Sequence, residues 1–77
     1  MRAAAAILYR GTKDSDYVPS REEIEVLDDY YNSVLQSTLE ICDLAYLGRI
    51  SQSVADIKMS ELHSLGLRYD AIRSRGL

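Results

Sequence analysis

The chain has 77 residues, a mass of 8.7 kDa and a formal net charge of −3, which limits it to one small domain with a modest core. Its single cysteine excludes an intrachain disulfide, and with a single histidine beside it the sequence cannot build a zinc cluster. No apolar run approaches the ~18 residues of a membrane span, and the alanine-rich start lacks the features of a signal peptide. We therefore expect one small helical domain over residues 1–77 of a cytoplasmic protein, with no membrane partner.

The charge is distributed unevenly along the chain. Residues 1–13 carry +3, residues 14–43 carry −8 and residues 44–77 carry +2. The acidic middle would repel the phosphates of nucleic acid, whereas either basic end can attract them weakly. Nucleic acid is therefore a disfavoured partner.

Residues 1–19 are expected to form an N-terminal arm and loop. The run from residue 3 to residue 9 favours a short helix that ends at Gly11, and its Ile-Leu-Tyr end is also typical of an extended arm or strand. The following residues to Pro19 favour a loop, because proline holds the residue before it in extended geometry.

The segment 20–47 carries the clearest local signal. Ser20 and Glu23 have the spacing of a capping box, in which each side chain binds the backbone N–H of the other residue. Beyond them no glycine or proline interrupts the sequence before Gly48, so a long helix is predicted. A 3.6-residue period places its apolar side chains on one arc: Ile24, Leu27, Tyr31, Val34, Leu35, Thr38, Ile41, Cys42 and Ala45.

The rest of the long helix supplies the predicted partner-binding residues. The acidic face, opposite the arc, is expected to meet a basic partner surface and comprises Glu22, Glu25, Asp29, Glu40 and Asp43. Apolar or aromatic contacts beside it are expected from Val26, Tyr30, Leu44 and Tyr46. The alternative is that the acidic face serves only solubility.

The segment 49–77 predicts a second, shorter helix from Ser51 to Leu65, ended by Gly66, and then a short C-terminal helix up to Gly76. The fold class is therefore all-α, with the long helix paired antiparallel with a shorter one in a helical hairpin. A helix of about 15 residues spans only ~22 Å and leaves part of the long apolar arc uncovered. We therefore expect a homodimer that forms a dimeric helical bundle, with the alternative that a larger protein receives the exposed apolar face of the long helix.

Enzyme chemistry finds no support in the sequence. Cys42 lies at the centre of the apolar arc, where a buried thiol is inert, and His63 has neither a second histidine nor a cysteine nearby in sequence. The two could form a nucleophile and base pair only with a third orienting group, and none stands at recognisable spacing. We expect no catalytic residue, no metal and no cofactor.

One alternative assigns DNA binding to the C-terminal half. Residues 49–57 read like the first helix of a helix-turn-helix, with the small Ala55 where a second helix packs closely. The turn glycine is replaced by Met59, and Lys58 stands at a position that should be apolar. Under this alternative the nucleic-acid contacts are Arg49, Lys58, Arg68, Arg73 and Arg75.

The sequence favours a non-enzymatic protein that binds a partner protein. A small, acidic, helical chain without a pocket or cofactor is typical of inhibitors, phage-encoded regulators, antitoxins and adaptors. Such a protein acts by occupying a partner's surface, including a basic surface that holds nucleic acid. The alternatives are a small transcriptional regulator and a structural subunit of a larger assembly.

Overall fold

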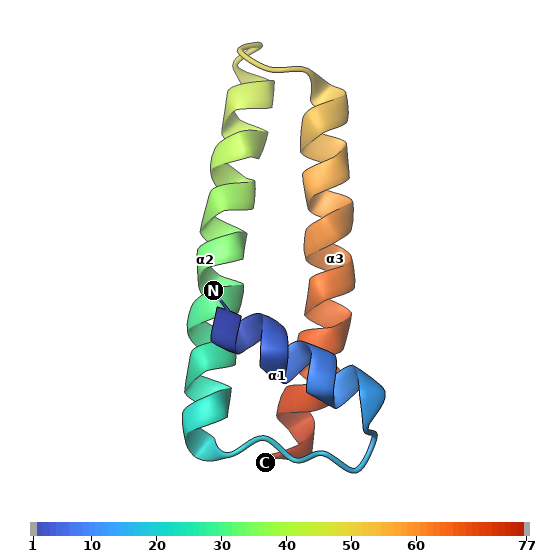
Figure 1. Ribbon diagram of the computed structural model, residues 1–77. Helices are drawn as coiled ribbons and strands as arrows, with labels where there is room; N and C mark the ends of the chain where they lie inside the picture. Colours follow the sequence, from blue (N-terminus) through green and yellow to red (C-terminus); the bar gives the residue numbers. More distant parts are fainter. Residues whose placement is uncertain (1, 77) are drawn as a thin grey trace.

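The computed structural model describes residues 2–76, which form three α-helices: α1 (Arg2–Lys13), α2 (Arg21–Tyr46) and α3 (Gln52–Arg75). Figure 1 shows α2 and α3 side by side and antiparallel, with α1 crossing the half of the hairpin that lies farther from their connecting turn. The molecule measures 44 × 21 × 19 Å. The predicted all-α class and the antiparallel pairing of the long helix are therefore confirmed.

The ends of α2 follow the local sequence signals. The Glu23 backbone N–H donates to Ser20 Oγ at 3.2 Å, and the Ser20 N–H donates to Glu23 Oε1 at 2.9 Å, so the capping box is formed. At the other end Gly48 has a φ of 75°, the left-handed geometry that glycine adopts without strain. The predicted start and end of the long helix are both confirmed to within a residue or two.

The C-terminal half differs from the prediction. Gly66 does not end a helix, because α3 continues through it to Arg75 as one element of 24 residues. A Cβ atom at Gly66 would lie 3.4 Å from the Tyr31 hydroxyl, an ordinary contact distance, so this position faces the Tyr31 ring across the hairpin. Continuing the helix also buries Leu65 and Ile72 in the core, which outweighs the modest cost of a helical glycine. The second helix nearly matches α2 in length, so the predicted length mismatch does not exist.

The N-terminal segment is a helix rather than an arm or a strand. It passes through Gly11 to Lys13, two residues beyond the predicted stop. A Cβ atom at Gly11 would stand only 2.5 Å from Ile72 Cδ1, which shows how tightly α1 is seated on α3. Both glycines therefore lie inside helices and face a neighbouring helix, but only at Gly11 would an added side chain overlap its neighbour.

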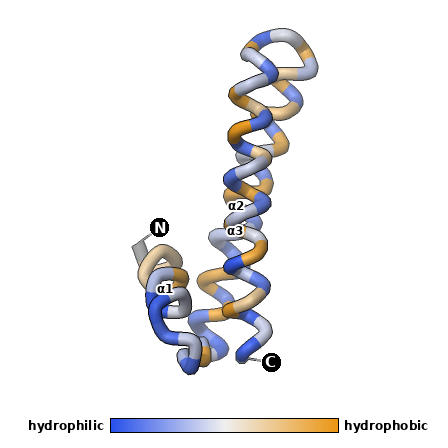
Figure 2. The backbone as a smooth tube through the Cα atoms, turned by 90° about the vertical axis from the view of Figure 1, so that its right-hand side faces the viewer, coloured by the Kyte–Doolittle hydropathy of each residue, from blue (hydrophilic) through white to orange (hydrophobic). Residues whose placement is uncertain are grey.

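The core lies at the end of the hairpin where α1 crosses it. Side chains from all three helices and from the α1–α2 loop form this cluster: Ile7, Leu8, Tyr17, Leu27, Leu65 and Ile72. Figure 2 shows α1 on one side of the hairpin only, with the half next to the α2–α3 turn extending beyond it. That distal half consists of two helices with no third layer among the described residues.

Candidate functional site

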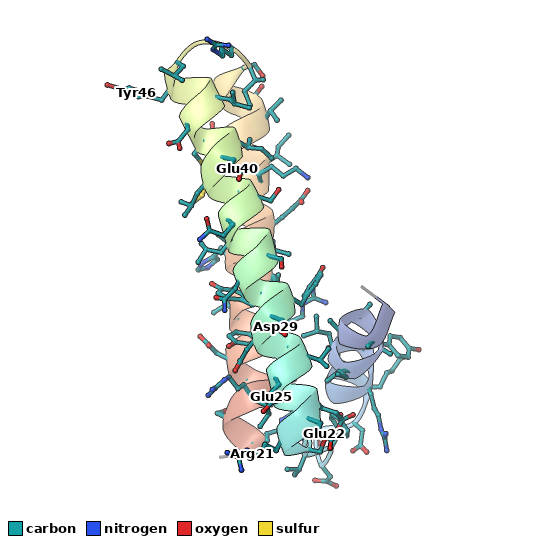
Figure 3. All side chains as sticks on the ribbon, turned by 90° about the vertical axis from the view of Figure 1, so that its left-hand side faces the viewer. Arg21, Glu22, Glu25, Asp29, Glu40 and Tyr46 are labelled. Atoms are coloured by element: carbon teal, nitrogen blue, oxygen red, sulfur yellow. The ribbon has the colours of Figure 1, made fainter. Side chains whose placement is uncertain are left out.

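The predicted acidic face is exposed along the outer side of α2. All five of its carboxylate residues are exposed, whereas each residue of the predicted apolar arc is buried or half-buried. Figure 3 shows the labelled members Glu22, Glu25, Asp29 and Glu40 spaced along the helix. The surface is hollowed only slightly, between Asp29 and Glu40. Five carboxylates on a convex surface attract cations and basic groups but enclose no ligand.

Of the predicted apolar and aromatic contacts, Tyr46 at the hairpin tip is the most exposed. Tyr46 is 89% exposed and the neighbouring Leu47 is 65% exposed. Figure 3 shows Tyr46 pointing outward, away from the side on which α1 lies. Leu44, another predicted contact, is exposed as well.

The backbone of the tip is fixed by two hydrogen bonds of the Schellman type. The Gly48 N–H donates to the Ala45 carbonyl at 3.0 Å, and the Arg49 N–H donates to the Leu44 carbonyl at 2.9 Å. These bonds satisfy carbonyls at the end of α2 and define how the last turn of the helix presents Tyr46. The backbone of the hairpin tip is therefore ordered.

Two of the four predicted apolar contacts pack on the core instead of forming free surface. Val26 and Tyr30 are half-buried and pack against the core cluster. The helical wheel of α2 placed them outside the apolar arc, but α1 covers that flank of the helix. A single-helix periodicity cannot reveal this second layer, because it depends on where a different helix docks.

Leu47 and two residues of α3 belong to the exposed apolar surface and were not predicted. Val54 and Ile57 are 42% and 58% exposed in the distal half of the hairpin. The apolar run before Gly48 includes Leu47 and could have indicated its exposure from the sequence. The exposure of Val54 and Ile57 follows instead from where α1 stops covering the hairpin.

A half-buried polar cluster joins α2 and α3 at the end of the hairpin that α1 crosses. Asp28 Oδ1 accepts hydrogen bonds from the Tyr69 hydroxyl and from Arg73 Nε, the latter at 2.8 Å. Tyr69 also stacks on Tyr31 with ring centroids 4.5 Å apart. The hydrogen bonds from Arg73 and Tyr69 lower the pKa of Asp28, while burial, followed by that carboxylate, raises the pKa of Tyr69 to about 12. The hydrogen bonds of Asp28 to Tyr69 and Arg73 thus join α2 to α3.

The α1–α2 loop is held by a second polar arrangement. Arg75 Nη1 donates to the carbonyl oxygens of Gly11, Asp14 and Tyr17 at 3.0, 3.3 and 3.4 Å. The Tyr17 ring lies under the Arg10 guanidinium at 4.7 Å. Its hydroxyl is buried without a hydrogen bond of normal geometry, and burial, with the nearby Glu23 carboxylate, raises the Tyr17 pKa to about 12.

The predicted helix-turn-helix is not formed. Residues 52–75 are one uninterrupted helix, so no turn separates a first helix from a recognition helix. Of the five basic residues assigned to nucleic acid, three contact the protein itself: Arg73 binds Asp28, Arg75 binds loop carbonyls and Lys58 pairs with Glu61 at 3.5 Å. The structure does not gather the five into one surface, because Arg49 lies at the tip and Arg75 at the opposite end.

Cys42 and His63 do not form a catalytic pair. Cys42 is half-buried in the distal half of α2, while His63 is exposed near the middle of α3, roughly 10 Å lower along the hairpin axis at 1.5 Å per residue. Among residues 2–76 no three histidine, cysteine or acidic side chains are grouped closely enough to hold a metal ion.

A groove on the α1 side of the hairpin was not predicted. It opens between α2 and α3 beyond the edge of α1 and is lined by Tyr30, Ser33, Val34, Ser37, Thr38, Lys58, Glu61, Leu65 and Arg68. Its walls mix hydroxyl groups, one ion pair and apolar side chains. Sequence periodicity could not reveal the groove, because it requires the register between two helices.

The comparisons with known proteins add no assignment to this geometry. Within the described part of the chain, no helix combines the length and the apolar character that crossing a membrane requires. No family model matches the chain, and neither the curated proteins nor the solved structures contain a significant match to it.

Proposed function

We propose that this chain is a non-enzymatic protein-binding protein that acts as an inhibitor, adaptor or regulator by occupying a partner's surface. The observation that carries the proposal is the apolar exposure at the ordered hairpin tip, where Tyr46 and Leu47 are 89% and 65% exposed. A tyrosine ring offers a large contact area with few rotatable bonds and a polar end, which is why tyrosine is enriched among interface hot spots.

The charge beside the tip indicates the chemistry of the partner. Glu40 and Asp43 are exposed within two helical turns of Tyr46, and the acidic face continues from them along α2. A complementary surface has an apolar recess for the tyrosine ring and basic residues beside it. Such charges chiefly accelerate association and select the partner, while the buried ring supplies most of the affinity.

The proposal includes the dimeric helical bundle expected from the sequence. The second helix is not short, so a length mismatch does not favour a dimer, but a different observation does. One side of the hairpin is covered by α1 and the other side is covered by no described residue. Exposed large apolar side chains on that uncovered side favour association with a second helical layer.

Photo-crosslinking from position 46 tests the partner-binding site. A photoreactive phenylalanine analogue replaces Tyr46, and the protein captured in the native host is identified and purified. Its affinity is then measured by calorimetry for the wild type, for Tyr46→Ser and for the control Tyr9→Ser. Tyr9 is also exposed, at 66%, but lies on α1.

Tyr46→Ser should weaken binding by about 30-fold, the loss typical of a hot-spot aromatic residue. Tyr9→Ser should leave the affinity within about twofold, because its ring is far from the tip. Equal affinities for all three proteins would show that the hairpin tip is not the binding site.

A further inference from the structure

The groove on the α1 side of the hairpin has a cationic side chain at each end. Its volume is about 580 Å³, which lies within the range typical of ligand sites. Lys58 and Arg68 both line it, ten residues apart on α3, which corresponds to ~15 Å along the helix axis. Arg68 is exposed and makes no ion pair among residues 2–76. The lining side chains of α2 include no charged group, so the groove favours an anionic ligand.

One end of the groove holds a buried hydroxyl that lacks a partner. Tyr31 lies against Gly66 across the hairpin. Counted seven residues from this contact along the antiparallel helices, Thr38 stands within about one residue of the level of Lys58. The Thr38 side chain is only 3% exposed, and its hydroxyl lines the groove without a hydrogen bond to any described residue. Water or a ligand in the groove therefore satisfies this hydroxyl.

The section between the two ends is apolar. Leu65 is buried and Val34 is half-buried, and both line the groove between the levels of the two cations. Tyr30 lines it toward the Arg68 end, because Tyr30 stands next to the residue that contacts the middle of α3 at Gly66. A ligand that fills the groove therefore carries an apolar group at its centre and a negative charge toward each end.

From this arrangement we infer that the groove binds an extended acidic segment of a partner protein. The segment has carboxylate side chains at its first and fifth positions and an apolar side chain at the third. Alternate side chains of an extended chain point the same way, and four steps of ~3.3 Å span ~13 Å, close to the ~15 Å between the cations. The carboxylates bind Lys58 and Arg68, and the apolar group packs on Val34 and Leu65. The backbone of the segment offers N–H and C=O groups to the Thr38 hydroxyl.

The burial of Thr38 favours an extended segment over a helix. An α-helix with its side chains is ~10 Å across, so it would rest on the rim of the groove and leave a hydroxyl that is 3% exposed out of reach. A single extended chain is narrower, since neighbouring strands of a sheet lie only ~4.8 Å apart. The inference rests on the proposed function, because the ligand belongs to a partner protein, and it adds a site with the opposite charge preference to that of the acidic face.

Glu61 makes the groove selective. It is the single carboxylate among the lining residues, and its Oε2 lies 3.5 Å from Lys58 Nζ. The two side chains are 62% and 44% exposed, so this ion pair is weak and an acidic ligand displaces it. The ligand therefore competes with Glu61 for Lys58, and removal of the Glu61 charge should strengthen binding.

Titration with a synthetic pentapeptide tests the groove. The probe has the order glutamate, serine, leucine, serine, glutamate, with both termini blocked, and backbone amide NMR of the full chain follows its binding. The wild type should bind it with a Kd of about 0.1–1 mM, with the largest shifts at the groove residues. The same peptide with lysine in place of both glutamates should not bind. Absence of saturable shifts at ~5 mM glutamate peptide overturns the inference.

Substitutions at the charged ends test the assignment of the contacts. Arg68→Gln should raise the Kd of the peptide about 10-fold, because a charge-assisted hydrogen bond is lost. Arg49→Gln is the matched control at the hairpin tip, outside the groove, and should leave the Kd within about twofold. Glu61→Gln should lower the Kd about threefold. Equal affinities of Arg68→Gln and Arg49→Gln would overturn the site.

Thr38→Val tests the hydroxyl, since valine keeps the shape of the side chain. It should raise the Kd of the peptide about fivefold and should not lower the Tm, because the hydroxyl has no protein partner to lose. A lower Tm with an unchanged Kd would overturn the role of Thr38 in binding.

A titration with suberate separates a peptide from a small molecule. Suberate carries two carboxylates on an apolar chain without amide groups, and it should bind at least ~5-fold more weakly than the peptide. Equal affinities would assign the groove to small dicarboxylates and overturn the inferred occupant. None of these titrations involves Tyr46 or the native partner, so their outcome is independent of crosslinking from position 46.

Discussion

Asp28 connects the two long helices through hydrogen bonds to two side chains of α3. The Tyr69 hydroxyl and the Arg73 guanidinium both donate to Asp28 Oδ1, and Arg73 Nη2 also reaches Oδ2 at 3.4 Å. A hydrogen bond to a charged acceptor in a half-buried site stabilises more than one between neutral groups. The cluster therefore makes a specific contribution to the hairpin that apolar packing alone does not supply.

Tyr69 and Tyr17 provide a matched test of this contribution. Tyr69→Phe removes a hydrogen bond to Asp28 and should lower the free energy of unfolding by about 1–2 kcal/mol. Tyr17→Phe removes a hydroxyl that has no hydrogen bond of normal geometry and should change it by less than about 0.5 kcal/mol. Urea denaturation followed by circular dichroism measures both values. A larger loss for Tyr17→Phe than for Tyr69→Phe would contradict the hydrogen-bond assignment.

The same two tyrosines predict how stability depends on alkaline pH. Both have a pKa raised from 10.0 to about 12 in the folded protein, so the folded state holds these protons more tightly than the unfolded state does. Their contribution to stability is complete below pH 10 and is lost as the pH rises toward 12. The double variant Tyr17→Phe/Tyr69→Phe should show a shallower fall in the free energy of unfolding across this range. Identical pH profiles for variant and wild type would contradict the raised pKa values.

At the scale of the helices, α2 could be predicted from the sequence and α3 could not. The capping box and Gly48 act through the local backbone, and both are visible in the sequence. Gly66 looked like another helix end, but its role depends on the Tyr31 ring across the hairpin. A glycine inside a helix that faces a neighbouring ring and a glycine that ends a helix look the same in the sequence. Only the tertiary partner distinguishes them.

Alanine substitutions at two helical glycines separate these roles. Gly66→Ala should stabilise the protein by about 0.5–1 kcal/mol, because alanine favours the helix and its Cβ would meet Tyr31 at an ordinary contact distance. Gly11→Ala should destabilise it by about 1–3 kcal/mol, because its Cβ would overlap the buried Ile72 side chain. Thermal and urea unfolding measure both changes. Loss of stability in Gly66→Ala would indicate that α3 breaks at that residue.

At the scale of the whole molecule, the position of α1 decides which predicted site residues are accessible. It covers Val26 and Tyr30 and leaves Leu44 and Tyr46 exposed, although all four were expected to be available to a partner. The five carboxylates of the acidic face could be predicted, because exposure opposite an apolar arc follows from the helical period alone. The exposure of the tip depends on how the three helices are stacked, which no single-helix pattern contains.

Charge reversal on the acidic face tests whether that face contributes to binding. Glu25 and Asp29 are exposed one turn apart, so they repel each other weakly and contribute little to stability. The double variant Glu25→Lys/Asp29→Lys should keep or slightly raise the Tm, and it should slow association with the partner most clearly at low salt. Stopped-flow or surface-plasmon measurements give the association rate. An unchanged rate in a folded variant would assign the acidic face to solubility alone.

Arg75 donates a hydrogen bond to the carbonyl oxygen of Gly11, which lies 64 positions earlier in the chain. This separation has a consequence during synthesis on the ribosome. The capped α2 can form soon after it leaves the exit tunnel, since its signals are local. The core cluster of Ile7 and Leu8, in contrast, is completed only when Ile72 has been made. At about 5–20 residues per second the delay between Leu8 and Ile72 lasts roughly 3–13 s. Throughout that interval the side of α1 that packs on α3 stays uncovered, and a nascent-chain chaperone can bind it.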